Sequence, residues 1–110
     1  MSWTALNQLT QLSQLDELSQ EQACIIFKHS TRCSISHMVL SRFERENDIE
    51  EKSYFFLDLI SYRDLSNAIE ERYQVKHESP QLLVIKKSQC VAHASHQSIN
   101  QLALKDFCNE

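Results

Sequence analysis

The sequence predicts a three-layer α/β/α fold, in which a central mixed β-sheet lies between two layers of helices. Apolar runs of strand length alternate along the chain with segments whose apolar residues recur every three or four positions, the spacing of a helix face. The last two strand-like runs are joined by a short polar turn, which predicts a hairpin and therefore an antiparallel edge on an otherwise parallel sheet. The 110 residues are enough for one compact domain, predicted to span 1–110.

The first half of the chain contains two predicted strands and two predicted helices. A short strand is predicted at 3–6, and leucines at every third position predict a helix from about Thr10. The continuous apolar run at 23–28 is typical of a buried parallel strand. One face of the next helix is marked by apolar residues at helical spacing: Ile35, Met38, Val39 and Phe43.

The second half contributes a strand, a helix, two strands and a final helix, predicted at 54–60, 65–73, 81–85, 89–93 and 99–107. The polar turn at 86–88 joins the two strands of the hairpin. The complete order is therefore β-α-β-α-β-α-β-β-α. Crossover connections of this kind place helices on both faces of the sheet.

Composition argues against several classes of function. The 15 acidic and 11 basic residues give a net charge of −4, and the basic residues are scattered, so we expect no nucleic-acid partner. We also expect no membrane association and a cytoplasmic location, because the apolar runs are short and the first residues do not resemble a secretory signal. Glycine is absent, which excludes a glycine-rich phosphate loop. Turns that require positive φ should then be few, or be formed by Asn, Asp or Ser.

The four cysteines are widely spaced, and reduced thiols are expected rather than a disulfide framework. Cys24 lies within the first long apolar run and is interpreted as inert core. Cys90 lies beside the hairpin turn, and the pattern does not decide which face it occupies. Cys108 is expected to be exposed, and it could resolve a disulfide on Cys33 only if the C-terminal segment folded back.

Cys33 lies where the buried strand ends and the next helix begins. The unpaired N–H groups and the positive dipole end of a helix N-terminus favour an anion, and a thiolate is the reactive form of cysteine. His29 and Arg32 could orient or stabilise that thiolate, or they could be ordinary loop residues. The alternative for Cys33 itself is a small apolar residue at the start of a core helix.

Ser36 lies three residues after Cys33, where a dithiol oxidoreductase would carry its second cysteine. A mixed disulfide on Cys33 would then have to be released by an external thiol or by a cysteine elsewhere in the chain. Ser36 could also satisfy an N–H group of the first helical turn.

No metal site is predicted. His29, Cys33 and His37 are spaced by four, but a strand-to-helix junction interrupts the helical periodicity that a metal site would need. His93 and His96 fall in a connection and are interpreted as solvated.

Four segments, in order along the chain, resemble the monothiol bacilliredoxin family, and the resemblance covers nearly the whole chain. They are His-Ser-Thr-Arg-Cys-Ser-Ile-Ser at 29–36, Arg-Asp-Leu-Ser-Asn-Ala-Ile at 63–69, Val-Lys-His-Glu-Ser-Pro-Gln at 75–81 and His-Ala-Ser-His at 93–96. The sequence departs from the family at Ser34, where proline is expected in many members, and at Gln74, where a helix end would usually carry glycine. Neither departure removes the thiol chemistry.

The resemblance implies a thioredoxin-like fold and a single-cysteine reaction that removes bacillithiol, or a similar low-molecular-weight thiol, from mixed disulfides on client proteins. Cys33 would be the nucleophile. Pro80 would be a cis-proline that exposes the backbone of Ser79 to an extended substrate, with Thr31 and Arg32 also at the substrate site. No cofactor is implied, because the small thiol acts as a co-substrate.

Two other functions remain open. Some single-cysteine proteins of this fold carry an iron–sulfur cluster between two chains, although the Cys-Gly-Phe-Ser motif of such carriers is missing here. The third possibility is a non-catalytic binding module of the same fold, in which Cys33 is incidental.

Overall fold

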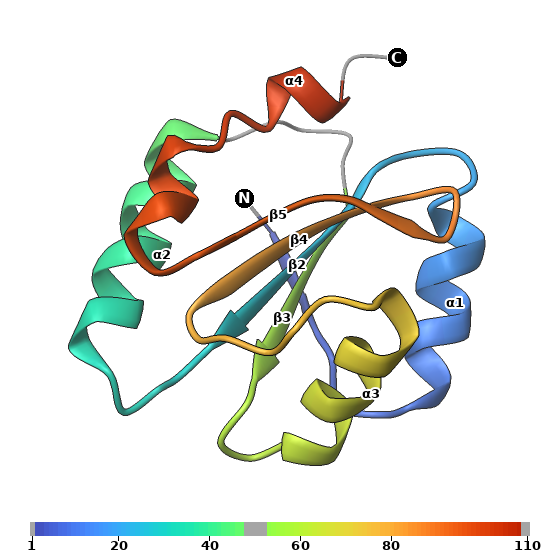
Figure 1. The fold of residues 1–110 in the computed structure, drawn as a ribbon, viewed down its shortest axis with the longest axis horizontal. Coiled ribbons are helices and arrows are strands. Elements are labelled where there is room, and N and C mark those ends of the chain that lie inside the picture. Colours follow the sequence, from blue (N-terminus) through green and yellow to red (C-terminus); the bar gives the residue numbers. More distant parts are fainter. Residues whose placement is uncertain (1, 48–52, 109–110) are drawn as a thin grey trace.

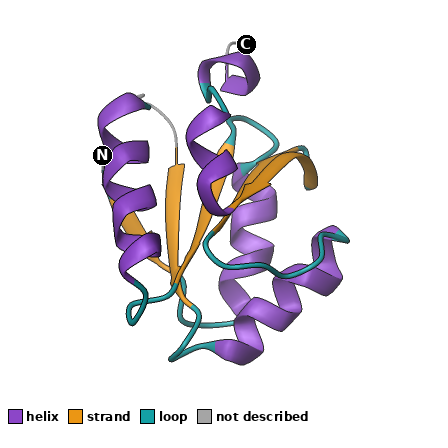
Figure 2. Cartoon of the chain, turned by 60° about the vertical axis from the view of Figure 1, so that its left-hand side comes forward, coloured by secondary structure: helices purple, strands orange, loops and turns teal. Residues whose placement is uncertain are grey.

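The computed structural model describes residues 2–47 and 53–108. A five-stranded sheet with the order β1-β3-β2-β4-β5 lies between two helical layers (Figure 1). Helices α1 and α3 cover one face, and α2 with the C-terminal helices covers the other (Figures 1 and 2). The predicted three-layer α/β/α fold is therefore confirmed.

The strands are β1 (Trp3–Ala5), β2 (Cys24–His29), β3 (Ser53–Asp58), β4 (Gln81–Lys86) and β5 (Gln89–Ser95). β3 pairs in parallel with both β1 and β2, whereas β4 pairs antiparallel with both β2 and β5. The sheet is thus mixed, as predicted. Strand β3 ends earlier than expected because the carboxylate of Asp58 starts a turn, accepting the Ile60 N–H at 3.1 Å and the Ser61 hydroxyl at 3.0 Å.

The helices are α1 (Thr10–Leu18), α2 (Ser34–Glu46), α3 (Arg63–Tyr73), the 3₁₀ helix η1 (His96–Gln101) and α4 (Lys105–Cys108). Among the residues that the structure describes, no helix is long and apolar enough to cross a membrane.

The single final helix predicted at 99–107 is wrong. The chain instead forms η1, an extended link and the short α4. Ile99 and Leu104 are both fully buried in the same apolar cluster, and the Leu104 N–H donates to Oδ1 of the buried Asn47 at 3.2 Å. A tertiary hydrogen bond and two buried side chains thus hold this region in place of a continuous series of helical hydrogen bonds.

Strand β2 is the centre of the molecule, and every residue in it is buried. Successive side chains of a strand point to opposite faces. Cys24 and Ile26 join the cluster formed with α1 and α3, while Ile25 and Phe27 join the cluster formed with α2 and η1. The last two residues of the strand continue this alternation, and both are polar.

Positive φ occurs at Gln74, Lys87, Ser88 and His96, so the expectation that Asn, Asp or Ser would fill such positions holds only for Ser88. Gln74 ends α3 in the left-handed region. Lys87 and Ser88 form the two-residue β4–β5 turn, for which two consecutive positive φ values match the twist of a hairpin. Their N–H groups donate to the carbonyl and hydroxyl of Ser19, each at 2.9 Å, and these bonds stabilise the strained turn.

Candidate active site

Cys33 is the N-cap residue of α2, with an extended backbone conformation. Its N–H donates to the Ser30 carbonyl at 3.1 Å, and its own carbonyl accepts the His37 N–H at 3.2 Å, the first bond of the helix. The side chain is half-buried. The structure therefore places this thiol at the N-terminus of α2, where unpaired N–H groups favour an anion.

Two other cysteines have side chains that the structure describes, and both are free thiols in protected positions. Cys24 is fully buried, and burial, assisted by the nearby Asp16 carboxylate, raises the pKa of its thiol to about 12. Burial also raises the pKa of the half-buried Cys90. Both groups are thus held as unreactive thiols at neutral pH. The side chain of Cys108 lies outside the described part of the chain, so its suggested resolving role stays a prediction.

Ser36 is fully buried behind the turn that carries Cys33. Its Oγ accepts the Ser30 N–H at 3.2 Å and lies 2.6 Å from Nδ1 of His29. The hydroxyl therefore satisfies an N–H of the preceding turn rather than one in the first turn of the helix. It joins the turn to the end of β2.

His29 is buried, which excludes an ordinary exposed loop position. Its ring packs edge-on against His37, with centroids 4.5 Å apart, and also contacts Phe56. Burial, together with the charge of His37 when it is protonated, lowers the pKa of His29 despite the opposing effect of Asp58. His29 is therefore neutral at pH 7, and its Nδ1 contacts the Ser36 hydroxyl.

Thr31 and Arg32 form the exposed part of the turn before Cys33. The Thr31 carbonyl accepts a hydrogen bond from Nε2 of His37 at 3.0 Å, which fixes the backbone of the turn and leaves the two side chains in solvent. His37 thus supports the turn from the first part of α2, a contact that the spacing of the histidines alone did not reveal.

Ser79 and Pro80 immediately precede β4, which pairs with β2, and the peptide bond between them is cis. Pro80 is buried, and its carbonyl accepts the His96 N–H at 2.9 Å. Oγ of Ser79 is buried and has no hydrogen-bond partner among the described residues. Because Lys28 pairs with Gln81, this segment is held at the same end of the sheet as the turn after β2.

The sequence suggests Lys28 only as one of several basic groups near Cys33, and it does not reveal that this lysine is buried against α3 and the segment before Ser79. Lys28 is fully buried, and its ammonium donates to the Ser66 carbonyl at 3.3 Å and to Nδ1 of His77 at 3.4 Å. Burial lowers the pKa of Lys28 to about 8, although Glu70 opposes the change. The signal available in the sequence was a charged residue at the end of an otherwise apolar strand.

The lysine cluster consists of Lys28, Ser66, Glu70 and His77. The backbone N–H of His77 donates to the Glu70 carboxylate, and the ring also contacts the Ser66 hydroxyl at 3.0 Å. Nδ1 of His77 faces an ammonium and therefore acts as an acceptor, so the ring is neutral. Burial first, then the charge of Lys28, lowers the pKa of His77 accordingly. The cluster ties the segment before Ser79 to β2 and α3.

The predicted site residues fall into two groups. Cys33 begins α2, where Ser36 of the first turn contacts His29, whereas Ser79 and Pro80 lie on the segment that enters β4. His93 and His96 are exposed, as the sequence interpretation had them. Within the described ranges, no three His, Cys, Asp or Glu side chains gather where they could hold a metal ion.

Comparison with solved structures places this geometry in a known fold. A protein named as a candidate oxidoreductase with a thioredoxin fold superposes with a TM-score of 0.82 at 28% identity, covering 94% of this chain and 91% of the other. Thioredoxin from Trypanosoma brucei brucei superposes with a TM-score of 0.73 at 13% identity, covering 96% of this chain and 90% of the other. The reduced thioredoxin pre-protein of Schistosoma mansoni superposes with a TM-score of 0.70 at 17% identity, covering 97% of this chain and 95% of the other. The last two matches show the fold alone.

The family comparison is more specific than the fold. The model of the monothiol bacilliredoxin BrxC matches residues 4–104, a span that includes the turn around Cys33, the Ser79–Pro80 segment and the start of the C-terminal helices. Together with the thioredoxin fold, this match supports a thiol oxidoreductase-like role. The chain belongs to the monothiol bacilliredoxin family.

Proposed function

We propose that this protein is a monothiol thiol–disulfide oxidoreductase that removes bacillithiol, or a similar low-molecular-weight thiol, from mixed disulfides on client proteins. The observation that carries the proposal is the position of Cys33, half-buried at the N-cap of α2, with Ser36 rather than a second thiol behind it. Family membership supports the same chemistry. The small thiol is a co-substrate, and the expected location is the cytoplasm, where client thiols are kept reduced.

The reaction consists of two thiol–disulfide exchanges. The Cys33 thiolate attacks the sulfur of the small thiol in the mixed disulfide, and the client leaves as a thiolate. Cys33 then carries the small thiol. A second small-thiol thiolate attacks that adduct, which regenerates Cys33 and releases the symmetric disulfide of the small thiol.

The surroundings of Cys33 favour release by an external thiol. Ser36 occupies the position of a resolving cysteine, and its hydroxyl is engaged by the Ser30 N–H and by His29. Cys24 is enclosed in the core on the face of the sheet away from α2. Neither residue offers a thiolate to an adduct on Cys33.

The client segment is proposed to bind beside the reactive thiol. Ser79 and Pro80 would present their backbone for pairing with an extended chain, as in other strand-addition complexes. Thr31 and Arg32 are exposed on the turn next to Cys33 and complete the proposed substrate-binding set.

Intact-mass measurement tests the proposal directly. The reduced protein is incubated with bacillithiol disulfide or with glutathione disulfide, and we expect the mass of one small thiol to be added. The adduct should be lost in Cys33→Ser and retained in the matched control Cys90→Ser. A S-bacillithiolated client protein should then return to its reduced mass when the unaltered protein and bacillithiol are added.

Two results would contradict the proposal. An adduct that persists in Cys33→Ser would assign the chemistry to another cysteine. A client that is reduced equally fast by Cys33→Ser and by the unaltered protein would show that bacillithiol alone performs the exchange.

A further inference from the structure

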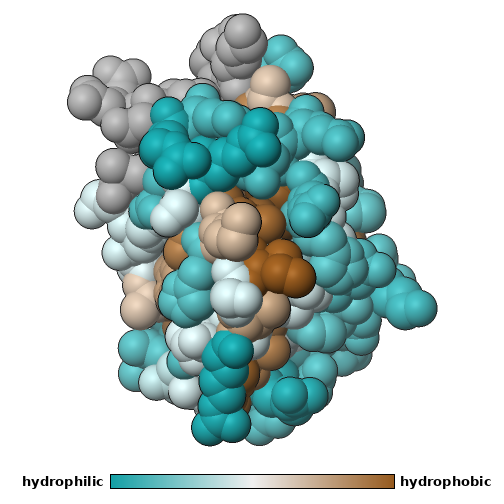
Figure 3. All heavy atoms as spheres, turned by 90° about the vertical axis from the view of Figure 1, so that its left-hand side faces the viewer, coloured by the Kyte–Doolittle hydropathy of each residue, from teal (hydrophilic) through white to brown (hydrophobic). Residues whose placement is uncertain are grey.

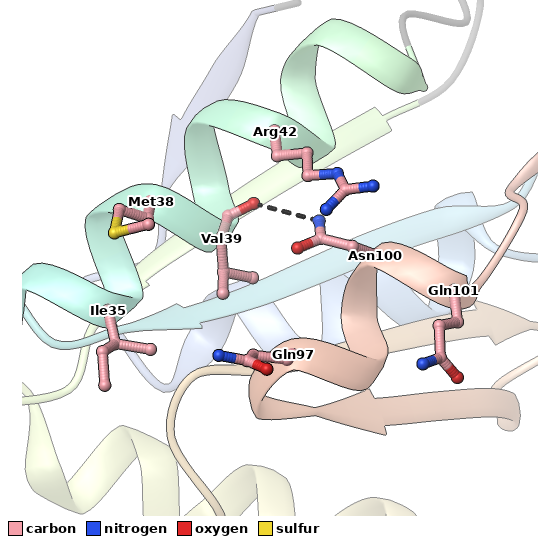
Figure 4. Close-up of a pocket in the computed structure, with 7 residues that line it drawn as sticks. All are labelled: Ile35, Met38, Val39, Arg42, Gln97, Asn100 and Gln101. Atoms are coloured by element: carbon pink, nitrogen blue, oxygen red, sulfur yellow. Dashed lines mark hydrogen bonds between the residues drawn. The ribbon is translucent and has the colours of Figure 1, made fainter.

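We propose that a groove between α2 and η1 binds the part of the low-molecular-weight thiol that lies beyond its sulfur, and that Arg42 binds a carboxylate on that part. This inference rests on the proposed function and names the class of co-substrate: a small thiol that carries a carboxylate. The groove has a volume of about 390 Å³. Its lining residues come from two elements (Figure 4): Ile35, Met38, Val39 and Arg42 from α2, and Gln97, Asn100 and Gln101 from η1.

One end of the groove is formed by Ile35, which is close to Cys33 in the chain, and the groove extends from there along α2. The lining residues of α2 recur at helical spacing and form one stripe, whose first member, Ile35, follows Cys33 by two residues. Arg42 follows Ile35 by seven positions, a distance of about 10 Å along the helix axis. Ile35 and Gln97 lie toward one end of the groove, and Arg42 and Asn100 lie toward the other (Figure 4). A small molecule joined to Cys33 through its sulfur could thus extend along the groove.

The surface of the groove is partly apolar and partly polar. Ile35 and Met38 are 50% and 71% exposed, and the face formed by α2 and η1 shows apolar surface surrounded by hydrophilic atoms (Figure 3). The η1 side contributes amide side chains. One of these, Asn100, donates through Nδ2 to the Val39 carbonyl at 3.4 Å, which fixes η1 against α2. Amides both donate and accept hydrogen bonds, so this wall suits hydroxyl or amide groups of a ligand.

Arg42 is the charged member of the lining. Its Nε atom donates to Oε1 of Glu46 at 2.9 Å, and both side chains of this pair are about half exposed. An exposed pair of this kind contributes little to stability, so a ligand can compete with it. The Nη atoms lie outside that bond and can donate to a carboxylate, the anion that a guanidinium matches best in geometry.

Size and chemistry favour a small thiol over a client protein as the occupant. A volume of about 390 Å³ is within the range of sites that enclose one small ligand. A client segment would need a longer surface, and the backbone of Ser79 and Pro80 is the surface proposed for it. An apolar client side chain would also offer no hydrogen bond to the Gln97 and Gln101 amides or to the Nη atoms of Arg42.

Exchange kinetics with three symmetric disulfides test this assignment. In each reaction the Cys33 thiolate attacks one sulfur, a Cys33 mixed disulfide forms, and the other half leaves as a thiolate. Bacillithiol disulfide and glutathione disulfide carry carboxylates, whereas hydroxyethyl disulfide is short and uncharged. For each carboxylated disulfide we take the ratio of its rate constant to the rate constant of hydroxyethyl disulfide. We expect this ratio to fall at least fivefold in Arg42→Gln. Arg45→Gln is the matched control, because Arg45 is exposed on the same helix but does not line the groove.

An equal fall in Arg45→Gln would show a general charge effect and overturn the proposal. An unchanged ratio in Arg42→Gln, with slower exchange only on a protein mixed disulfide, would assign the groove to the client instead. If the unaltered protein reacts with none of the disulfides, the proposed function is wrong, and the groove assignment that rests on it falls as well. A second measurement is the NMR spectrum of the Cys33–glutathione adduct. We expect shifts of the Gln97, Asn100 and Gln101 side-chain amides, and their absence would place the tail elsewhere.

Discussion

Ser36 shows how a single residue connects the reactive turn to the core. Its spacing from Cys33 was visible in the sequence, and so was the consequence that no second thiol lies in the motif. The contacts of its hydroxyl were not visible, because they depend on His29 reaching across from the end of a strand and on the fold of the turn at Ser30. A pattern read along one helix cannot show such a contact, since the partner belongs to another element.

Replacing this hydroxyl should weaken the fold. In Ser36→Ala the Ser30 N–H loses its acceptor and Nδ1 of His29 loses its neighbour, inside a buried site. An unsatisfied buried polar group costs about 1–3 kcal/mol, and we expect the free energy of unfolding to fall by about that amount. Urea unfolding measures the change. Ser34→Ala is the control, because Ser34 is exposed on the same turn of helix, and equal losses in the two variants would contradict the role assigned to Ser36.

At the scale of elements, the strands and the first three helices could be predicted because each carries its own periodic pattern. The C-terminal region could not, because Ile99, Leu102 and Phe107 have helical spacing while the chain between them is held by Asn47. The glycine-free turns were also misjudged. Gln74 and Lys87 adopt positive φ because the ends of α3 and of the β4–β5 hairpin require it, whichever residue occupies the position.

The lysine cluster joins three elements, and its effect should appear in the pH dependence of stability. Burial lowers the pKa of Lys28 from 10.5 to about 8 in the folded protein. Between these values the unfolded chain binds more protons, so the free energy of unfolding should rise with pH by up to ~1.4 kcal/mol per pH unit. Lys28→Met removes this contribution. The difference in unfolding free energy, unaltered protein minus Lys28→Met, should therefore increase as pH rises from 8 to 10.

Urea titrations at several pH values between 7 and 10 measure that difference. The four cysteines are present in both proteins, so their effects cancel. Lys76→Met serves as the control, because Lys76 is exposed on the same segment as His77. For Lys76→Met, the plot of unfolding free energy against pH should run parallel to the plot for the unaltered protein. A Lys28→Met curve that also runs parallel would mean that Lys28 keeps its ordinary pKa in the folded state.

At the scale of the whole molecule, the two apolar clusters lie on opposite faces of one sheet. The α1/α3 cluster includes Ile69, and the α2/η1 cluster includes Phe27 and Tyr54, against which Trp3 packs. Trp3 contacts their rings edge-on, and its Nε1 donates to Glu44 of α2 at 2.8 Å. The edge strand β1 is thereby fixed to the helical layer opposite Ile69. Strand β2 contributes side chains to both clusters. Unfolding of either cluster should therefore displace β2 and destabilise the other cluster.

This arrangement predicts that the chain unfolds as one cooperative domain. Trp3 is the only tryptophan, so its fluorescence reports on the α2/η1 face, while far-UV circular dichroism reports on all helices and strands. The two urea transitions should coincide, as expected for a single domain of this size. Ile69→Ala removes buried side-chain volume from the far face and should cost about 2–5 kcal/mol. Both transitions should then move to lower urea by the same amount. If the fluorescence transition stayed in place while the circular dichroism transition moved, the two layers would be unfolding separately, and the single-domain prediction from the sequence would be wrong.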